Sequence, residues 1–389
     1  MPDPAPPARP RFARHLVLIA GLLVVALGVV VVRNWDGAVR AARDAGSMGE
    51  GSETAASLRE PADVLAWVRD HPGASLVVWD VAADSAVVAI RPDERRPVAG
   101  LTGLLLAAEL VRRGGAGLDT ATVLPASAVE RRRLPGAEPA RERAPASLAD
   151  LARQALGADR AAADALLWTL GRRATDALPA RLGLAALEAP LPLDGLLLAW
   201  APADRPGPRE TQLDQFLALD RAAQRDSAFS RSQAYVKSRA YRSAEQVRLE
   251  RVGLGLSRDD QRAAAQATFP RGTARAYARL LARSARGDLL GPAASDVFLD
   301  LVARPATDSL QARGGRRLGV VGGGFPGLLG TAAVFQSGRG GRVAVLLVED
   351  APNAVFFHLA QSGLDAGLVL DLVVPSERRD TLSVRSGAP

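Results

Sequence analysis

The side chains that most often carry chemistry are scarce in this sequence, and their scarcity narrows the reactions it could perform. Its 389 residues include no cysteine, and the only histidines are His15, His71 and His358. Without cysteine there is no disulfide, no thiolate metal site and no cysteine nucleophile. Because the histidines are far apart in sequence, we expect no three-histidine zinc site and no cofactor.

Arginine supplies nearly all of the positive charge. Lys237 is the only lysine, so 48 of the 49 basic residues are arginines, and the formal net charge is +7. Such a balance can indicate a nucleic-acid partner. Here the arginines are spread along the chain among 42 acidic residues, without a nucleic-acid motif. The Gly322-Gly323-Gly324 run also lacks the spacing of a nucleotide-binding loop. We therefore expect no nucleic-acid partner and interpret the arginine bias as compositional.

The elements that position these residues can be predicted from apolar periodicity and turn signals. The chain is long enough for one large domain or two modest ones, and its composition, 48% hydrophobic and 23% charged, excludes wholesale disorder. The predicted elements are helix 61–70, strands 75–81 and 86–90 as a buried hairpin, helix 96–110, a mostly helical stretch 118–301, strands 327–336 and 342–349, and helix 353–372. This order predicts a two-lobed α+β fold with the terminal helices on one face of an antiparallel sheet.

An apolar segment near the N-terminus predicts a membrane anchor. Residues 16–32 form an unbroken run of apolar or glycine residues, long enough to span a bilayer. Arg9, Arg11 and Arg14 precede the run, so the positive-inside rule places the N-terminus in the cytoplasm. A cleaved signal peptide is the alternative, but the run is longer than a typical signal core. The predicted organisation is a cytoplasmic N-terminus (1–15), a transmembrane signal anchor (16–33), a flexible linker (34–58), an extracytoplasmic domain (59–376) and a tail (377–389).

Five stretches of the sequence carry local motifs in a distinctive order: Arg96–Leu105, Ala158–Gly171, Arg181–Leu184, Phe269–Leu281 and Val320–Gly324. Together with the order of the elements, these stretches resemble the class A serine β-lactamases and their penicillin-binding relatives. The resemblance covers residues 59–374. It implies a two-lobed β-lactamase/transpeptidase fold, in which an antiparallel sheet flanked by the N- and C-terminal helices adjoins a helical lobe. It also implies the chemistry of a serine hydrolase.

The nucleophile motif of that family is not preserved. In the family, a Ser-x-x-Lys motif at a helix start supplies the attacking hydroxyl and the lysine that helps to deprotonate it. The matching residues here are Gly100 and Gly103, which have neither a hydroxyl nor an amine. Shifting the register to Thr102 places Leu105 at the lysine position. The resemblance therefore predicts the fold without this catalytic unit.

The other family motifs are altered as well. Ala158-Asp159-Arg160 stands where the family has Ser-Asp-Asn, and we expect Asp159 to be a helix-start carboxylate that accepts backbone N–H groups. Val321-Gly322-Gly323 stands where the family has a strand lysine followed by Thr or Ser and Gly. Lys237 lies in none of these motifs. Glu188 is nearest in order to the glutamate that activates water in class A enzymes, but its flanking residues are unlike that loop.

Two functional classes remain compatible with this sequence. One is a membrane-anchored, catalytically inactive domain that binds peptidoglycan, a β-lactam-like ligand or an envelope protein. The other is an active β-lactamase or D,D-peptidase with non-standard catalytic residues. A purely structural role in an envelope complex is a third, plainer interpretation. The pattern of segment 201–262 predicts an elaboration of the helical lobe. The alternative is that this segment docks a partner or acts as a lid. The altered motifs favour the inactive domain.

Overall fold

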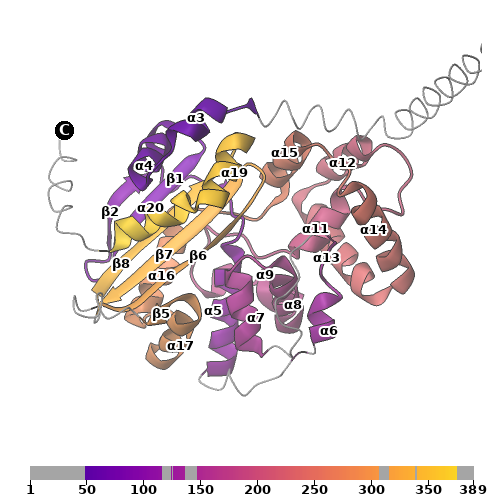
Figure 1. The fold of residues 1–389 in the computed structure, drawn as a ribbon. Helices are drawn as coiled ribbons and strands as arrows, with labels where there is room; N and C mark the ends of the chain where they lie inside the picture. Colours follow the sequence, from indigo (N-terminus) through magenta and orange to yellow (C-terminus); the bar gives the residue numbers. More distant parts are fainter. Residues whose placement is uncertain are drawn as a thin grey trace, which may run out of the picture. The chain divides into compact units, whose positions relative to one another are not determined.

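The structure, a computed structural model, describes residues 49–115, 124, 126–135, 147–305, 315–337 and 340–374. They contain a six-stranded sheet, in the order β2-β1-β8-β7-β6-β5, in which every neighbouring pair is antiparallel (Figure 1). The strands are β1 (Ala74–Asp80), β2 (Ser85–Ile90), β5 (Arg304–Pro305), β6 (Gly315–Phe325), β7 (Leu328–Ser337) and β8 (Gly340–Val348). The predicted α+β fold with an antiparallel sheet is confirmed.

One face of the sheet is covered by helices from the two ends of the described chain. They are α3 (Ser52–Ser57), α4 (Pro61–Asp70), α19 (Asn353–Ser362) and α20 (Leu364–Val373). Their apolar side chains form one cluster with alternate strand residues such as Leu76, Val78 and Leu346. Helix α20 lies against α4, β7 and β8. The prediction that the N- and C-terminal helices share one face is therefore confirmed.

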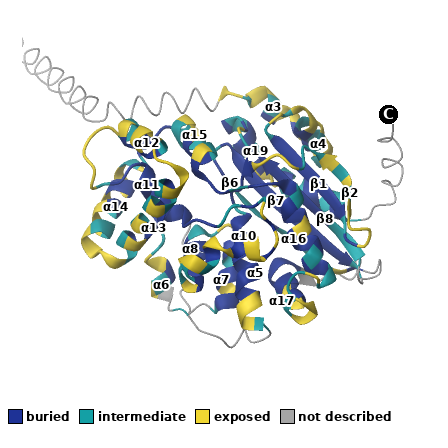
Figure 2. Cartoon of the chain, turned by 180° about the vertical axis from the view of Figure 1, so that it is seen from behind, coloured by how far each residue is buried: buried dark blue, intermediate teal, exposed yellow. Residues whose placement is uncertain are grey.

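The opposite face is covered by α16 (Ala274–Arg286), with α17 (Pro292–Val302) beside it. Val77, Trp79 and Val345 belong to the cluster on this side. Because both faces of β1, β7 and β8 are covered, the sequences of these strands are almost continuously apolar. Figure 2 shows these central strands as buried. Edge strand β2 alternates between exposed and half-buried residues, so only β1 of the predicted hairpin is fully buried.

The helical lobe lies in the chain between two short paired strands, β3 (Arg96–Pro97) and β4 (Arg271–Gly272). Its helices are α5 (Thr102–Gly114), α6 (Ala126–Glu130), α7 (Leu148–Leu156), α8 (Arg160–Leu170), α9 (Arg172–Asp176), α10 (Leu178–Arg181), α11 (Leu193–Trp200), α12 (Arg209–Leu217), α13 (Arg221–Lys237), α14 (Arg239–Val252) and α15 (Arg258–Thr268). Apolar α5 is buried along most of its length, as predicted, against α7, α8 and α17. The predicted lobe, 118–301, extends too far, since α16 packs on the sheet.

Three other predicted boundaries are wrong for local reasons. The helix predicted from Arg96 begins at Thr102, because Arg96–Pro97 pairs with β4. The helix predicted at 353–372 breaks at Gly363, whose backbone is left-handed (φ 67°). The end of the predicted linker 34–58 is helix α3, which packs on α19. Segment 201–262 is largely helical, and its helix α13 packs along α11.

Strand β6 is the element that the sequence pattern revealed least. It pairs with β7 along its length, from Gly315 opposite Ser337 to Phe325 opposite Leu328. Its other edge pairs with β5 only at Arg317 and Leu318. Beyond that short pairing, β6 meets the helical lobe.

The predicted membrane segment 16–33 and the predicted tail 377–389 lie outside the described residues. Within the residues that the structure does describe, no helix is long and apolar enough to cross a bilayer.

Candidate functional site

The three altered motifs come together where the helical lobe meets the sheet. Gly100 lies two residues before α5, Ala158 lies two residues before α8, and Gly323 lies on β6. A β-carbon on Gly323 would lie 2.4 Å from the Cβ of Ala158, and one on Gly100 would lie 2.5 Å from the backbone nitrogen of Gly323. Segments separated by more than 150 residues therefore meet at one junction, which we call the motif junction.

Backbone atoms occupy the space that a nucleophile would need at residue 100. A β-carbon there would also lie 2.7 Å from the carbonyl carbon of Gly322, closer than the 3.0 Å below which something must shift. At residue 103, a β-carbon would lie 2.8 Å from the carbonyl oxygen of Ala155. A serine and a lysine at these positions would require β6 and the end of α7 to move away. Glycine at both positions is thus a packing requirement of this structure.

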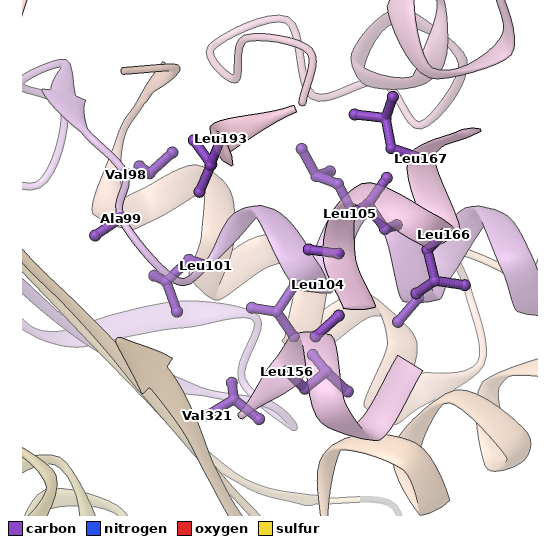
Figure 3. Packing of buried hydrophobic residues seen from close by; sticks show 14 of the residues in the cluster. Val98, Ala99, Leu101, Leu104, Leu105, Leu156, Leu166, Leu167, Leu193 and Val321 are labelled. Carbon is purple, nitrogen blue, oxygen red and sulfur yellow. The ribbon is translucent and has the colours of Figure 1, made fainter. Parts of the chain in front are cut away.

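Val321 is not the β6 residue that faces the second motif. Alternate residues of a strand point to the same side, so Val321 and Gly323 both face the lobe, but Gly323 is the one that meets Ala158. Val321 is buried in an apolar cluster with Leu104 and Leu156 (Figure 3). The match of Val321 to the family's strand lysine stays a prediction, while Gly323, two residues further along β6, is the residue that meets Ala158. The position opposite Ala158 has no side chain.

A small cavity remains at the motif junction. Its volume is about 30 Å³, which is room for one or two water molecules and far below the size of a typical ligand pocket. Its lining is mostly apolar and comprises Ala99, Gly100, Thr102, Ala155, Ala158, Asp159, Arg160, Ala163, Leu193, Phe269, Gly324 and Phe325. Thr102 carries the only hydroxyl group among these lining residues. The cavity has neither the size nor the polar lining of a substrate site.

Asp159 has the structural role that the sequence predicted. Its Oδ1 accepts a hydrogen bond from the backbone N–H of Ala162 at 3.1 Å and so caps α8. Its Oδ2 accepts a hydrogen bond from Nη2 of Arg133 at 2.8 Å. The preceding residue, Ala158, is left-handed (φ 66°), a conformation that costs energy in a residue with a β-carbon. The turn into α8 is therefore held by its cap against local strain.

Arg160 is engaged with a buried carboxylate rather than presented to a ligand. Its Nε donates to Oδ1 of Asp194 at 2.8 Å, while Oδ2 of Asp194 is buried with no hydrogen-bond partner among the described residues. A second carboxylate, Asp164, is only 1% exposed and accepts from the backbone N–H of Leu193 at 2.9 Å. Burial, reinforced by the charge of Asp194, raises the pKa of Asp164 well above its ordinary value. This pair of carboxylates was not predicted from the sequence. Its sequence signal is one acidic residue within each of the apolar helices α8 and α11.

Glu188 and Lys237 lie apart from the cavity, which neither of them lines. Glu188 Oε2 accepts from Nη2 of Arg221 at 2.7 Å and from the backbone N–H of Arg271 at 3.0 Å. Glu188 thus links α13 to β4. Lys237 is the last residue of α13. Neither residue is placed to activate a nucleophile or a water molecule in the cavity.

The described histidines bond to backbone groups. Nε2 of His71 lies 3.1 Å from the carbonyl oxygen of Glu349, and Nε2 of His358 lies 2.7 Å from that of Leu58. No group of three or more His, Asp or Glu residues within the described ranges could hold a metal ion.

We predict that Gly100→Ser lowers the free energy of unfolding by about 1–3 kcal/mol, the usual cost of overpacking. The reason is the close contact of residue 100 with Gly322 and Gly323. Urea denaturation measures the change. Gly157→Ser is the matched control, because a β-carbon there meets nothing closer than 3.5 Å, and we expect a change of at most about 0.5 kcal/mol. If both variants were as stable as the parent, β6 would be free to move away from α5.

We also predict that stability depends on pH through Asp164. Because its pKa is higher in the folded chain than in the unfolded chain, the folded state binds this proton more tightly. The contribution to the free energy of unfolding is fully present below the unfolded pKa of about 3.9 and is lost as the pH rises through the folded pKa. Asp164→Asn keeps an acceptor for Leu193 N–H without the charge, so it should stabilise the fold at neutral pH by roughly 1 kcal/mol.

Urea denaturation between about pH 4 and pH 8 measures this pH dependence. Asp164→Asn should give a flatter profile than the parent chain. Asp214→Asn, which neutralises an exposed carboxylate on α12, is the control and should leave the slope unchanged. A profile as steep for Asp164→Asn as for the parent would refute the assignment.

Comparison with solved structures finds several that are similar to this chain. Similar solved structures include the β-lactamase from Sphaerobacter thermophilus DSM 20745, with 14% identity and a TM-score of 0.48, covering 80% of this chain and 95% of that chain. The L2 protein complexed with relebactam has 18% identity and a TM-score of 0.46, covering 82% and 97%. An ancestral class A β-lactamase has 20% identity and a TM-score of 0.42, covering 78% and 98%.

A search of curated proteins finds no match to this sequence. A family model described as the β-lactamase enzyme family matches residues 61–361, which include the sheet, the helical lobe and all three altered motifs. Since this match extends over most of the chain, the chain belongs to the β-lactamase enzyme family.

Proposed function

We propose that this chain is a membrane-anchored, extracytoplasmic β-lactamase-like domain without hydrolase activity, which acts by binding an envelope partner. The observation that supports this most strongly is the packing of Gly100 against the backbone of Gly322 and Gly323. The family places a serine where Gly100 lies. Here the same space is filled by a strand.

The loss of rate that serine hydrolases suffer when catalytic groups are removed supports an inactive domain. In serine hydrolases, removing one member of the nucleophile–base unit costs on the order of 10⁴ to 10⁶ in rate. Here the serine, both lysines and the Ser-Asp-Asn hydroxyl and amide are all replaced. Backbone N–H groups that could stabilise an oxyanion do not need a side chain, but they cannot supply a nucleophile. Binding is the activity that such a scaffold retains.

The cavity favours a protein partner over a cell-wall fragment. A volume of about 30 Å³ is too small for a sugar ring or an acyl-peptide, because small-molecule sites usually enclose several hundred Å³. Arg160, the cationic lining residue, already bonds to Asp194. A partner would therefore bind the outer surface of the domain rather than the motif junction.

A hydrolase that uses Thr102 is the second candidate. Thr102 is the first residue of α5, and its side chain is buried and lines the cavity. The residue one turn later on the same face is Leu105 or Leu106, so no base follows it on the helix. The lining residues also include no lysine or histidine. Asp159 is the one carboxylate of the lining, and its oxygens already accept from Ala162 N–H and Arg133. The lining therefore offers Thr102 no uncommitted base to activate its hydroxyl group.

We predict that the purified chain forms no covalent adduct with a fluorescent penicillin and does not hydrolyse a chromogenic cephalosporin. Intact-mass spectrometry and absorbance measure the two outcomes, with an active class A β-lactamase as the positive control. A stoichiometric adduct that disappears in Thr102→Ala would contradict the proposal and identify the nucleophile. An adduct that persists in Thr102→Ala would also contradict it and direct peptide mapping to another hydroxyl.

The proposed anchor rests on the apolar run 16–32 and the arginines before it. We predict that a reporter active only in the cytoplasm is silent when fused after Pro389, because the positive-inside rule exports the chain that follows the run. Deleting residues 16–32 should restore reporter activity, which makes this deletion the matched control. A reporter that is active in the full-length fusion would exclude the proposed orientation.

A further inference from the structure

Away from the motif junction, one buried carboxylate holds three arginines together. The Glu109 side chain, on α5, is fully buried. Its oxygens accept from Nε and Nη2 of Arg112 at 2.8 and 3.0 Å, and from Nε of Arg113 at 2.8 Å. Nη2 of Arg181 lies 3.2 Å from Oε1 of the same carboxylate. We call these three residues the arginine cluster.

The arginine cluster keeps an excess of positive charge at the surface. The exposed fraction of the side chain is 40% for Arg112, 38% for Arg113 and 36% for Arg181. Together with Glu109 they carry a net charge of about +2. Burial acts to raise the pKa of Glu109, but hydrogen bonds from Arg112 and Arg113 outweigh it, so the pKa lies below its ordinary value. Glu109 therefore stays charged and keeps the guanidinium groups oriented.

Packing of the helices holds the arginine cluster in place. Nη1 of Arg113 donates to the carbonyl oxygen of Leu170 at 2.9 Å, at the end of α8. Arg181 donates to the carbonyl oxygen of Ala174, on α9. The helix dipole accounts for arginines in the last turn of α5. Arg181 comes from a different helix, since it is the last residue of α10. Helix α10 is labelled beside α5 in Figure 2.

The surface of α9, which bonds to Arg181, carries two further arginines. An open depression on α9 and its flank is lined by Arg172, Arg173, Asp176 and Ala177. Ala174, which bonds to Arg181, lies in the same helix. Arg172 pairs with acidic residues, whereas Arg173 is exposed. The cluster arginines are themselves 36–40% exposed, so an anion can reach them directly from solvent.

We propose that Arg112, Arg113 and Arg181 form a binding site for a phosphate group, with Glu109 as a positioning residue. A phosphate monoester carries a charge of −1.5 to −2 at neutral pH, close to the charge of the site. Each guanidinium group has five N–H donors, so donors remain for phosphate oxygens beside those given to Glu109, Leu170 and Ala174. The same chemistry is presented by a soluble phosphate compound and by a phospholipid headgroup. This site is separate from the motif junction and does not depend on the proposed function.

Titration calorimetry of the full-length chain with inorganic phosphate at low ionic strength tests the site. Sodium chloride at the same ionic strength corrects for general screening. We expect Arg112→Gln to weaken phosphate binding about tenfold or more, the loss expected for a charge-assisted hydrogen bond. Arg112→Lys should also weaken phosphate binding, because lysine keeps the positive charge but lacks the planar set of N–H donors. The matched control is Arg153→Gln, which removes an arginine of similar exposure from a single-acid pair on α7.

A second pair of measurements separates the two sources of phosphate. Glycerol 3-phosphate represents a soluble ligand, and phosphatidylglycerol vesicles, compared with phosphatidylcholine vesicles, represent a lipid surface. Because the apolar run 16–32 can bind any bilayer, the lipid result is the difference between parent and Arg112→Gln. Arg181→Gln replaces Arg112→Gln if circular dichroism shows that the latter is unfolded. If Arg153→Gln weakens binding as much as the cluster variants, or if no phosphate compound or vesicle distinguishes them from the parent, the site does not exist.

Discussion

The close approach of β6 to the start of α5 is the contact on which the rest of this domain depends. Gly100 and Gly323 lie backbone against backbone, and the turn at Ala158 closes the junction from the side of α8. A single β-carbon on either glycine would collide with a neighbouring atom within 2.5 Å. Two glycines thus allow the sheet and the helical lobe to approach so closely that only a cavity of about 30 Å³ remains between them. The same contact leaves no room for a β-carbon at residue 100 unless β6 moves.

The polar groups near this junction are used to hold the lobe together. Asp159 caps α8 and bonds to Arg133, while Arg160 bonds to Asp194. Asp164 accepts the first N–H of α11. In a catalytic cleft such groups would face a substrate, and their pKa values would serve proton transfer. Here the raised pKa of Asp164 results from burial and from the charge of Asp194, so its consequence is a pH-dependent stability.

The arginine-rich composition also has a structural explanation. Arg91 donates to the carbonyl oxygens of Val68, Arg69 and His71 at the end of α4, and of Ala74 at the start of β1. One planar side chain thus satisfies four backbone acceptors, which a lysine could not reach from one position. Arg91 therefore serves the fold through its hydrogen bonds. The arginine cluster differs, because three partly exposed guanidinium groups share the single buried carboxylate of Glu109.

The sequence by itself determined the elements whose residues carry a pattern. Apolar periodicity located helix α4, the β1–β2 hairpin and the C-terminal helices, and motif order brought Gly100, Ala158 and β6 into one expected site. The N-cap role of Asp159 was also predictable, since a helix-start carboxylate satisfies its own helix whatever lies beyond. These are local or family-level features. They depend on residues close together in the chain or on a shared order of elements.

Only the tertiary structure decided the features that depend on distant segments. Glycine residues give no apolar periodicity, so the extent of β6 is known only from its pairing with β7. That Gly323, and not Val321, lies opposite Ala158 is likewise known only from the structure. Whether a glycine has open space or a strand above it depends on backbone more than 200 residues away, as at Gly100. The buried acids Asp164 and Asp194 were missed for the same reason. From the sequence alone, a single acidic residue in an apolar helix is expected at the surface. Only the packing of a second helix over it shows that it is buried.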